Sequence, residues 1–132
     1  LDYLKFEGDK NYDINLEVYI QPENGEENLI SESNYKYMYW NMTQQLAHHT
    51  LNGCNLEVGD LYASGTISGN DPKSYGSMLE LTWRGENPIT LNNGEERKFI
   101  EDNDTVTMKA WAEKDGVRVG FGEVSGKIIP TK

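Results

Sequence analysis

Two stretches of strict alternation between apolar and other residues constrain the fold more than any other feature of the chain. In Tyr12–Ile20 the apolar residues fall at every second position, and Thr105–Ala112 repeats this pattern near the other end. Alternation with a period of two places the apolar side chains on one face of a β-strand. Asp115-Gly116, which follows the second stretch, is typical of a tight turn between antiparallel strands. Both stretches are therefore predicted to be strands.

A hairpin and one long helix are predicted in the first half of the chain. Asn24-Gly25 favours a tight turn, and Glu27–Ser31 follows it as the returning strand. The run Tyr35–Leu51 contains no Pro or Gly and places apolar residues at helical spacing. Gly53 follows as a natural stop. The sequence predicts one main helix over Tyr35–Leu51.

The second half is predicted to be β-structure. Leu61–Ile67 is expected to form a strand rich in small residues, and Met78–Trp83 alternates again. As a strand, Met78–Trp83 would place Leu79, Leu81 and Trp83 on one apolar face that anchors the strand, and Glu80 on the other. We expect seven or eight strands in a β-rich α+β fold of the sandwich, roll or barrel kind.

Composition narrows the classes of partner. The chain of 132 residues is long enough for a single domain, and its 12 basic against 22 acidic residues give a net charge of −10. This charge argues against nucleic acid and against anionic membrane surfaces, which attract basic patches. A single cysteine excludes an intrachain disulfide and favours a reducing compartment. No apolar run is long enough to span a bilayer, and we expect a cytoplasmic location.

Two features that suggest chemistry have simpler structural explanations. His48 and His49 are neighbours on the predicted helix, where adjacent side chains diverge by about 100° and do not converge on one metal ion. Histidines near a helix end also interact well with its partial negative charge. Cys54 has no second cysteine nearby, and we expect it to be a buried structural thiol.

Pattern alone leaves the role of the second half open. Thr66 and Ser68 lie among small residues that permit close approach of a ligand to the backbone. For Glu80 an exposed outer face is the simpler interpretation, with a functional carboxylate as the alternative. The other acidic residues are scattered beside turns, and no set of them assembles into a cation site.

Three segments resemble the fumarylacetoacetase family. They are Ser33–Gly69, Gly76–Gly85 and Val119–Pro130, which occur in the same order and with similar gaps. The resemblance extends from about Tyr12 to Pro130. It implies an enzyme that hydrolyses the carbon–carbon bond of 4-fumarylacetoacetate to fumarate and acetoacetate, in tyrosine and phenylalanine breakdown. It also implies a mixed β-roll or β-sandwich domain, a homodimer and a divalent cation, Ca²⁺ or Mg²⁺.

The resemblance assigns roles to two residues. Glu80 matches the glutamate that orients the family's base histidine, and Thr66 matches a threonine that contacts substrate. The base histidine and the metal-binding carboxylates of the family lie upstream of the matching region. Residues 1–132 are therefore expected to be one domain fragment, from the C-terminal part of the catalytic domain, that binds no cation and is inactive alone. A fragment with uncovered strands is also expected to self-associate.

Two alternatives remain. A related enzyme of the superfamily, such as an acylpyruvate hydrolase, a decarboxylase or an isomerase of keto acids, would share the same fold. The Met78–Leu81 run resembles the fumarylacetoacetase branch more than these relatives. A non-catalytic β-rich module for binding or assembly is the other alternative, in which Thr66 and Glu80 would be ordinary surface residues.

Overall fold

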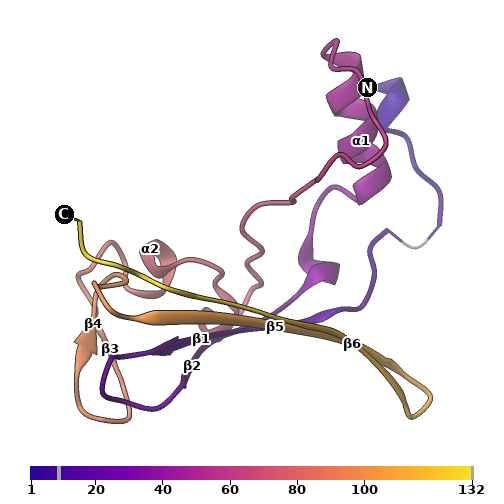
Figure 1. Cartoon of the computed structure of the whole chain (residues 1–132). Coiled ribbons are helices and arrows are strands. Elements are labelled where there is room, and N and C mark those ends of the chain that lie inside the picture. The colour runs from indigo at the N-terminus through magenta and orange to yellow at the C-terminus, as the bar shows by residue number, and fades with distance from the viewer. Residues whose placement is uncertain (9, 132) are drawn as a thin grey trace.

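The structure is a computed structural model that describes residues 1–8 and 10–131. Figure 1 shows a long antiparallel sheet with smaller elements above one face and a helix that stands away from it. The strands are β1 (Asn15–Gln21), β2 (Asn28–Asn34), β3 (Ile89–Thr90), β4 (Glu96–Arg97), β5 (Thr105–Lys114) and β6 (Val117–Lys127). The helices are α1 (Met42–Leu51) and α2 (Met78–Leu81), with 3₁₀ turns η1 (Asp2–Leu4), η2 (Tyr35–Tyr37) and η3 (Pro72–Ser74).

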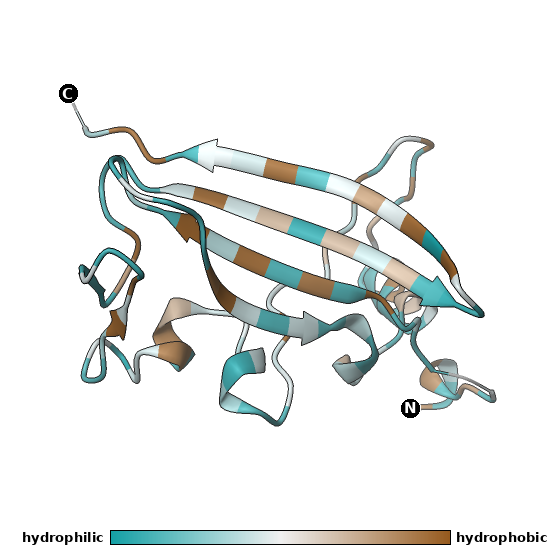
Figure 2. Cartoon of the chain, turned by 90° about the horizontal axis from the view of Figure 1, so that it is seen from below, coloured by the Kyte–Doolittle hydropathy of each residue, from teal (hydrophilic) through white to brown (hydrophobic). Residues whose placement is uncertain are grey.

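The two alternating segments pair with each other at the centre of the main sheet. The strand order is β2-β1-β5-β6, with every neighbouring pair antiparallel. Val18 lies opposite Met108, and Met108 lies opposite Val124 on the next strand. The apolar positions of the three strands therefore share one face, as the alternating bands in Figure 2 indicate. The predicted strands and the turn at Asp115-Gly116, where both residues have positive φ, are confirmed.

The core on this face is small. Ile20 is fully buried on β1, and Leu91 beside the β3–β4 hairpin is the other large apolar side chain that is almost fully buried among the described residues. Serine hydroxyls of β2 fasten the covering loop to the sheet: Ser31 donates to the carbonyl of Tyr75 at 2.7 Å, and Ser33 donates to that of Ile67 at 2.9 Å. The covering layer is thus tied to the β2 edge.

The prediction of one helix over Tyr35–Leu51 is wrong in its first half. Helix α1 begins only at Met42, because Asn41 adopts an extended backbone and caps it. The Asn41 side chain accepts from the Gln44 amide, and the Gln44 side chain accepts from the Asn41 amide, which together form a capping box. Gln44 also donates to the carbonyl of Leu4, so α1 packs on η1 rather than on the sheet.

The number of strands is also lower than expected. The described residues form six strands rather than seven or eight, because Met78–Trp83 is helical and Leu61–Ile67 has no pairing partner among them. Gly65, at a φ of +76°, interrupts the extended run. The result is a β-rich α+β arrangement with antiparallel sheets and two helices. None of the helices in the described part of the chain has the length and apolar character needed to cross a bilayer.

Candidate active site

Glu80 lies on a short helix and not on the predicted strand. Ser77 takes an extended backbone, and its hydroxyl accepts from the Glu80 amide at 3.4 Å at the start of α2. Ser77-Met78-Leu79-Glu80 matches the Ser-x-x-Glu pattern that begins helices. This local capping signal overrides the alternation that predicted a strand. It is also the feature of the sequence that could have shown Ser77 to be a contact of Glu80.

The anchoring face expected from Leu79, Leu81 and Trp83 does not form, because Met78–Leu81 is helical. Leu79 and Trp83 are 54% and 64% exposed, so these two side chains do not hold the segment against the core. Trp83 and Arg84 instead adopt positive φ values of 51° and 61° and end the helix. Thr82 is the anchor: its fully buried hydroxyl lies 2.7 Å from the carbonyl of Met78 and 2.9 Å from that of Lys98.

Two serine hydroxyls hold one oxygen of the Glu80 carboxylate. Ser68 donates to Oε2 at 2.9 Å, and Ser77 donates to the same oxygen at 2.7 Å. The Ser68 hydroxyl accepts in turn from the amide of Gly76 at 3.0 Å. Within the described part of the chain, Oε1 has no hydrogen-bond partner. The half-buried carboxylate is therefore oriented through one oxygen, with the other able to accept from a further donor.

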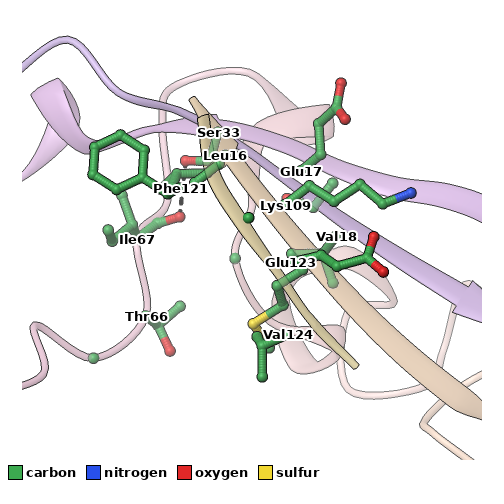
Figure 3. Close-up of a pocket in the computed structure, with 16 residues that line it drawn as sticks. Leu16, Glu17, Val18, Ser33, Thr66, Ile67, Lys109, Phe121, Glu123 and Val124 are labelled. Atoms are coloured by element: carbon green, nitrogen blue, oxygen red, sulfur yellow. Dashed lines mark hydrogen bonds between the residues drawn. The ribbon is translucent and has the colours of Figure 1, made fainter. Parts of the chain in front are cut away.

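Thr66 lines a cavity of about 510 Å³ between the covering loop and the sheet. Figure 3 shows Thr66 and Ile67 on the loop side, with the charged ends of Lys109 and Glu123 on the other side of the β5–β6 ribbon. The size suits a small ligand, since such pockets have volumes of about 300–1,000 Å³. The wall that the sheet contributes is mainly apolar and includes Leu16, Val18, Met108 and Val124.

Gly76 brings the segments of Thr66 and Glu80 together. A Cβ at Gly76 would lie 2.6 Å from the Ile67 carbonyl oxygen and 2.8 Å from a Thr66 methyl carbon, so only glycine permits this contact. Gly76 lines the cavity with Thr66, whereas Glu80 is not among the lining residues. The structure thus places the two predicted residues on adjacent segments joined through Ser68, with only Thr66 at the cavity.

The remaining candidates stand apart from this region. The Tyr3 hydroxyl lies 3.0 Å from Nδ1 of His48, while the ring of His49 meets that of Tyr62 edge-on at 5.3 Å. The two histidines therefore contact different aromatic residues. Cys54 is exposed, so the expectation of a buried thiol is wrong, because the segment after α1 does not pack on the core. Among the described residues, no three His, Cys, Asp or Glu side chains cluster as a metal site requires.

The perturbed pKa values belong to structural contacts. A hydrogen bond to Glu17 at 2.6 Å, with burial, raises the pKa of Tyr19 to about 12. A hydrogen bond to Glu27 raises the pKa of Lys109 on the same outer face of the sheet. Hydrogen bonding to the buried Asp104 raises the pKa of Arg97. These groups do not contact Glu80 or Thr66, so they do not mark a second catalytic centre.

Comparison with known proteins identifies the family of this chain. The family model described as fumarylacetoacetate (FAA) hydrolase C-terminal matches residues 5–129. The chain belongs to the fumarylacetoacetate hydrolase family. It is 51% identical over 131 residues to the fumarylacetoacetase of Homo sapiens, covering 98% of this chain and 31% of that protein. The Arabidopsis thaliana fumarylacetoacetase is 51% identical over 132 residues, with 99% and 31% covered.

A third relative matches the chain over nearly the same length. The fumarylacetoacetase of Caenorhabditis elegans is 49% identical over 129 residues, covering 97% of this chain and 31% of that protein. The chain thus spans about a third of the length of the curated relatives that it matches. Family membership agrees with the resemblance that the three sequence segments carry.

Proposed function

We propose that this chain is the C-terminal part of a hydrolase that cleaves the carbon–carbon bond of 4-fumarylacetoacetate, yielding fumarate and acetoacetate. The observation that carries the proposal is the match at about half identity along nearly the whole chain to fumarylacetoacetases from animals and a plant. Such extensive identity supports a shared reaction more strongly than a shared fold alone does.

Glu80 is proposed to position the base of this reaction. A carboxylate that accepts from the N–H of an imidazole fixes the tautomer of the ring and favours its protonated form. The free Oε1 of Glu80 is suited to this task, because Ser68 and Ser77 hold the carboxylate by Oε2 alone. The histidine itself would come from the part of the protein upstream of this chain. Thr66 is proposed to contact substrate at the cavity with its hydroxyl.

The described residues do not fit a divalent cation. Enzymes of this family are metal-dependent in general, yet no suitable cluster of His, Cys, Asp or Glu is present among residues 1–8 and 10–131. We therefore derive no step through a cation from this chain. Its ligands, for Ca²⁺ or Mg²⁺, are proposed to lie in the remaining part of the protein, and the 132-residue chain alone is proposed to be inactive.

The incomplete fold of this chain bears on the domain and the oligomer to which it belongs. We propose that residues 1–132 are one fragment of a catalytic domain whose complete form is a mixed β-roll or β-sandwich. The open faces of the sheet support this, since further strands are needed to cover them. The complete protein is proposed to be a cytoplasmic homodimer.

Replacing the Glu80 carboxylate tests the proposed role. In the longer protein that contains this chain, Glu80→Gln should lower kcat for 4-fumarylacetoacetate by about 10²–10⁴-fold, because an amide can present a donor to the base and cannot stabilise the imidazolium. KM should change little. Release of fumarate and acetoacetate provides the assay. Glu86→Gln, at an exposed glutamate of the following turn, is the matched control and should retain full activity.

Contrary results distinguish the alternatives. An unmodified full-length protein that cleaves acylpyruvates and not 4-fumarylacetoacetate would favour the related superfamily enzymes. Absence of activity on every keto acid tested would favour a non-catalytic module. Equal activity of the Glu80→Gln and Glu86→Gln variants would remove Glu80 from the mechanism.

A further inference from the structure

The hydroxyl of Ser68 donates to Glu80 in a direction that the backbone fixes. The amide of Gly76 donates to the Ser68 oxygen at 3.0 Å, and the same oxygen lies 2.9 Å from Oε2 of Glu80. An amide N–H can only donate, and a hydroxyl carries a single hydrogen. That hydrogen is therefore free to point at the carboxylate, while the lone pair on the other side of the oxygen is taken by Gly76.

Ser77 makes the equivalent contact from the other segment. Its hydroxyl lies 2.7 Å from the same Oε2 and accepts from the Glu80 amide, so its hydrogen also points at the carboxylate. A carboxylate oxygen offers about two lone-pair sites, and the two serine hydroxyls fill those of Oε2. An imidazole N–H that approaches this carboxylate must therefore bond to Oε1.

The backbone of Ser68 is held on both sides, and one of these contacts comes from the main sheet. The carbonyl of Ile67, the preceding residue, accepts from Ser33 of β2 at 2.9 Å. The amide of Gly69, the following residue, donates to the carbonyl of Ser74 at 3.0 Å. The position of the Ser68 hydroxyl is thus set relative to β2 and not by helix α2.

The amide of Gly76 is fixed in the same way. Tyr75 precedes it, and the Tyr75 carbonyl accepts from Ser31 of β2 at 2.7 Å. Gly76 also packs so closely on the carbonyl of Ile67 that an added Cβ would lie 2.6 Å from the oxygen. Helix α2, which carries Glu80, has only four residues, and so short a helix gains its order from its surroundings. The sheet supplies that order through the two β2 serines.

We propose that Ser68 is a positioning residue of the reaction, which links the order of the sheet to the direction of the Glu80 carboxylate. The inference rests on the proposed function, because Ser68 acts only through the glutamate that orients the base. Rotation of the carboxylate would break its contact with Ser68, with Ser77 or with both. Ser68 is not among the residues that line the cavity with Thr66, so its loss should affect kcat rather than KM.

Removal of the hydroxyl in the longer protein that contains this chain tests the proposal. Ser68→Ala should lower kcat for 4-fumarylacetoacetate by about tenfold with little change in KM. A misplacement of 1 Å costs about 10²-fold, and the remaining Ser77 contact limits the displacement. Ser68→Thr keeps the donor and should recover most of the rate. Ser64→Ala is the matched control and should keep full activity, because the Ser64 hydroxyl lies on the same loop and contacts the carbonyl of its neighbour Gly65.

A double-mutant cycle separates positioning through Glu80 from a general loosening of the loop. In a Glu80→Gln background, Ser68→Ala should lower kcat by less than about twofold, because the carboxylate that Ser68 positions is already gone. A purely structural role would lower kcat by the same factor in both backgrounds. Ser77→Gly removes the second donor and leaves a residue that is tolerated at the start of a helix. It should show the same dependence on Glu80.

The results also distinguish failure of this inference from failure of the proposed function. If the wild type cleaves 4-fumarylacetoacetate and Glu80→Gln is impaired, full activity of Ser68→Ala would overturn the positioning role alone. So would a higher KM at unchanged kcat, or equal losses with and without the Glu80 carboxylate. Full activity of Glu80→Gln, or a wild type that does not cleave this substrate, would overturn both the proposed function and the role of Ser68.

Discussion

At Glu80 the geometry of one carboxylate depends on two serines from different segments. Ser77 both begins α2 and donates to Oε2, whereas Ser68 reaches the same oxygen from the neighbouring loop. Two donors on one oxygen restrict the rotation of the carboxylate and leave Oε1 in a defined direction. The capping residue therefore couples the start of the helix to the orientation of the proposed positioning group.

Tyr19 provides a pH-dependent contribution to stability. Its hydroxyl donates to Glu17, which raises its pKa from 10.0 to about 12. A group whose pKa is raised on folding stabilises the folded state fully below its unfolded pKa. This contribution is lost as the pH rises from about 10 through about 12. The difference in unfolding free energy between the wild type and Tyr19→Phe should therefore shrink over this interval.

Absorbance of tyrosinate checks the same assignment directly. Among the eight tyrosines, the component that ionises near pH 12 should disappear in Tyr19→Phe. Tyr12→Phe removes an exposed tyrosine instead and should leave that component intact. Persistence of the late component in Tyr19→Phe would assign it to another tyrosine.

At the scale of elements, a buried ion pair ties the β3–β4 hairpin to the start of β5. Arg97 on β4 donates to both oxygens of Asp104, through Nε and Nη2, each at 3.0 Å. Asp104 is 1% exposed and also accepts from the amide of Glu101. Burying the charges of Arg97 and Asp104 is costly, and these hydrogen bonds offset the loss of their contacts with water. The tie explains how a hairpin with two-residue strands stays ordered.

Removing one member of this pair should be costly. Asp104→Ala should lower the unfolding free energy by about 3–5 kcal/mol, because the guanidinium of Arg97 would lose its buried partner. Urea unfolding measures the change. Asp102→Ala, at an exposed aspartate in the same turn, is the control and should have little effect. The double variant Arg97→Met, Asp104→Leu should recover much of the loss, and equal costs for Asp104→Ala and Asp102→Ala would contradict the role of the pair.

Elements with a signal of their own were predictable from sequence, and elements that depend on a partner were not. The alternation of β1 and β5 and the Asp115-Gly116 turn lie within short stretches, and all three are confirmed. Leu61–Ile67 has strand composition but no strand beside it among the described residues, which no local pattern reveals. At Met78–Trp83 two local signals conflict, and the cap at Ser77 prevails over alternation.

In the candidate site, too, features with a local sequence signal were predictable and contacts between separate segments were not. Family resemblance identified Thr66 and Glu80, whose roles stay predictions. Ser68, in contrast, contacts Glu80 twelve positions along the chain and Gly76 eight positions along it. Such contacts depend on how two loops pack, and no residue pattern specifies them. Only Ser77 had a recognisable signal, the Ser-x-x-Glu cap.

At the scale of the whole molecule, exposed apolar area and net charge act in opposite directions. The uncovered face of β5 and β6 favours association, as the exposure of Met108, Phe121 and Val124 indicates. A net charge of −10 on each copy opposes it. Which effect dominates depends on ionic strength, because salt screens the long-range repulsion and leaves the apolar contacts intact.

Self-association of the 132-residue chain should therefore become tighter as salt is added. At roughly 30 Å between centres, charges of −10 on each copy repel by about 14 kcal/mol in unscreened water. The Debye length falls from about 30 Å at 0.01 M salt to about 8 Å at 0.15 M, which removes most of this repulsion. Sedimentation equilibrium over this range of salt measures the dissociation constant.

Reducing the charge away from β6 separates the two contributions. Glu7→Lys with Glu86→Lys changes two exposed positions, and each substitution adds two charges, so the net charge of −10 becomes −6. Repulsion scales with the product of the charges and should fall to about a third. The double variant should therefore self-associate more tightly at low salt and respond less to added salt. An assembly that weakens as salt rises, in both proteins, would mean that ion pairs between the copies outweigh the repulsion between their net charges.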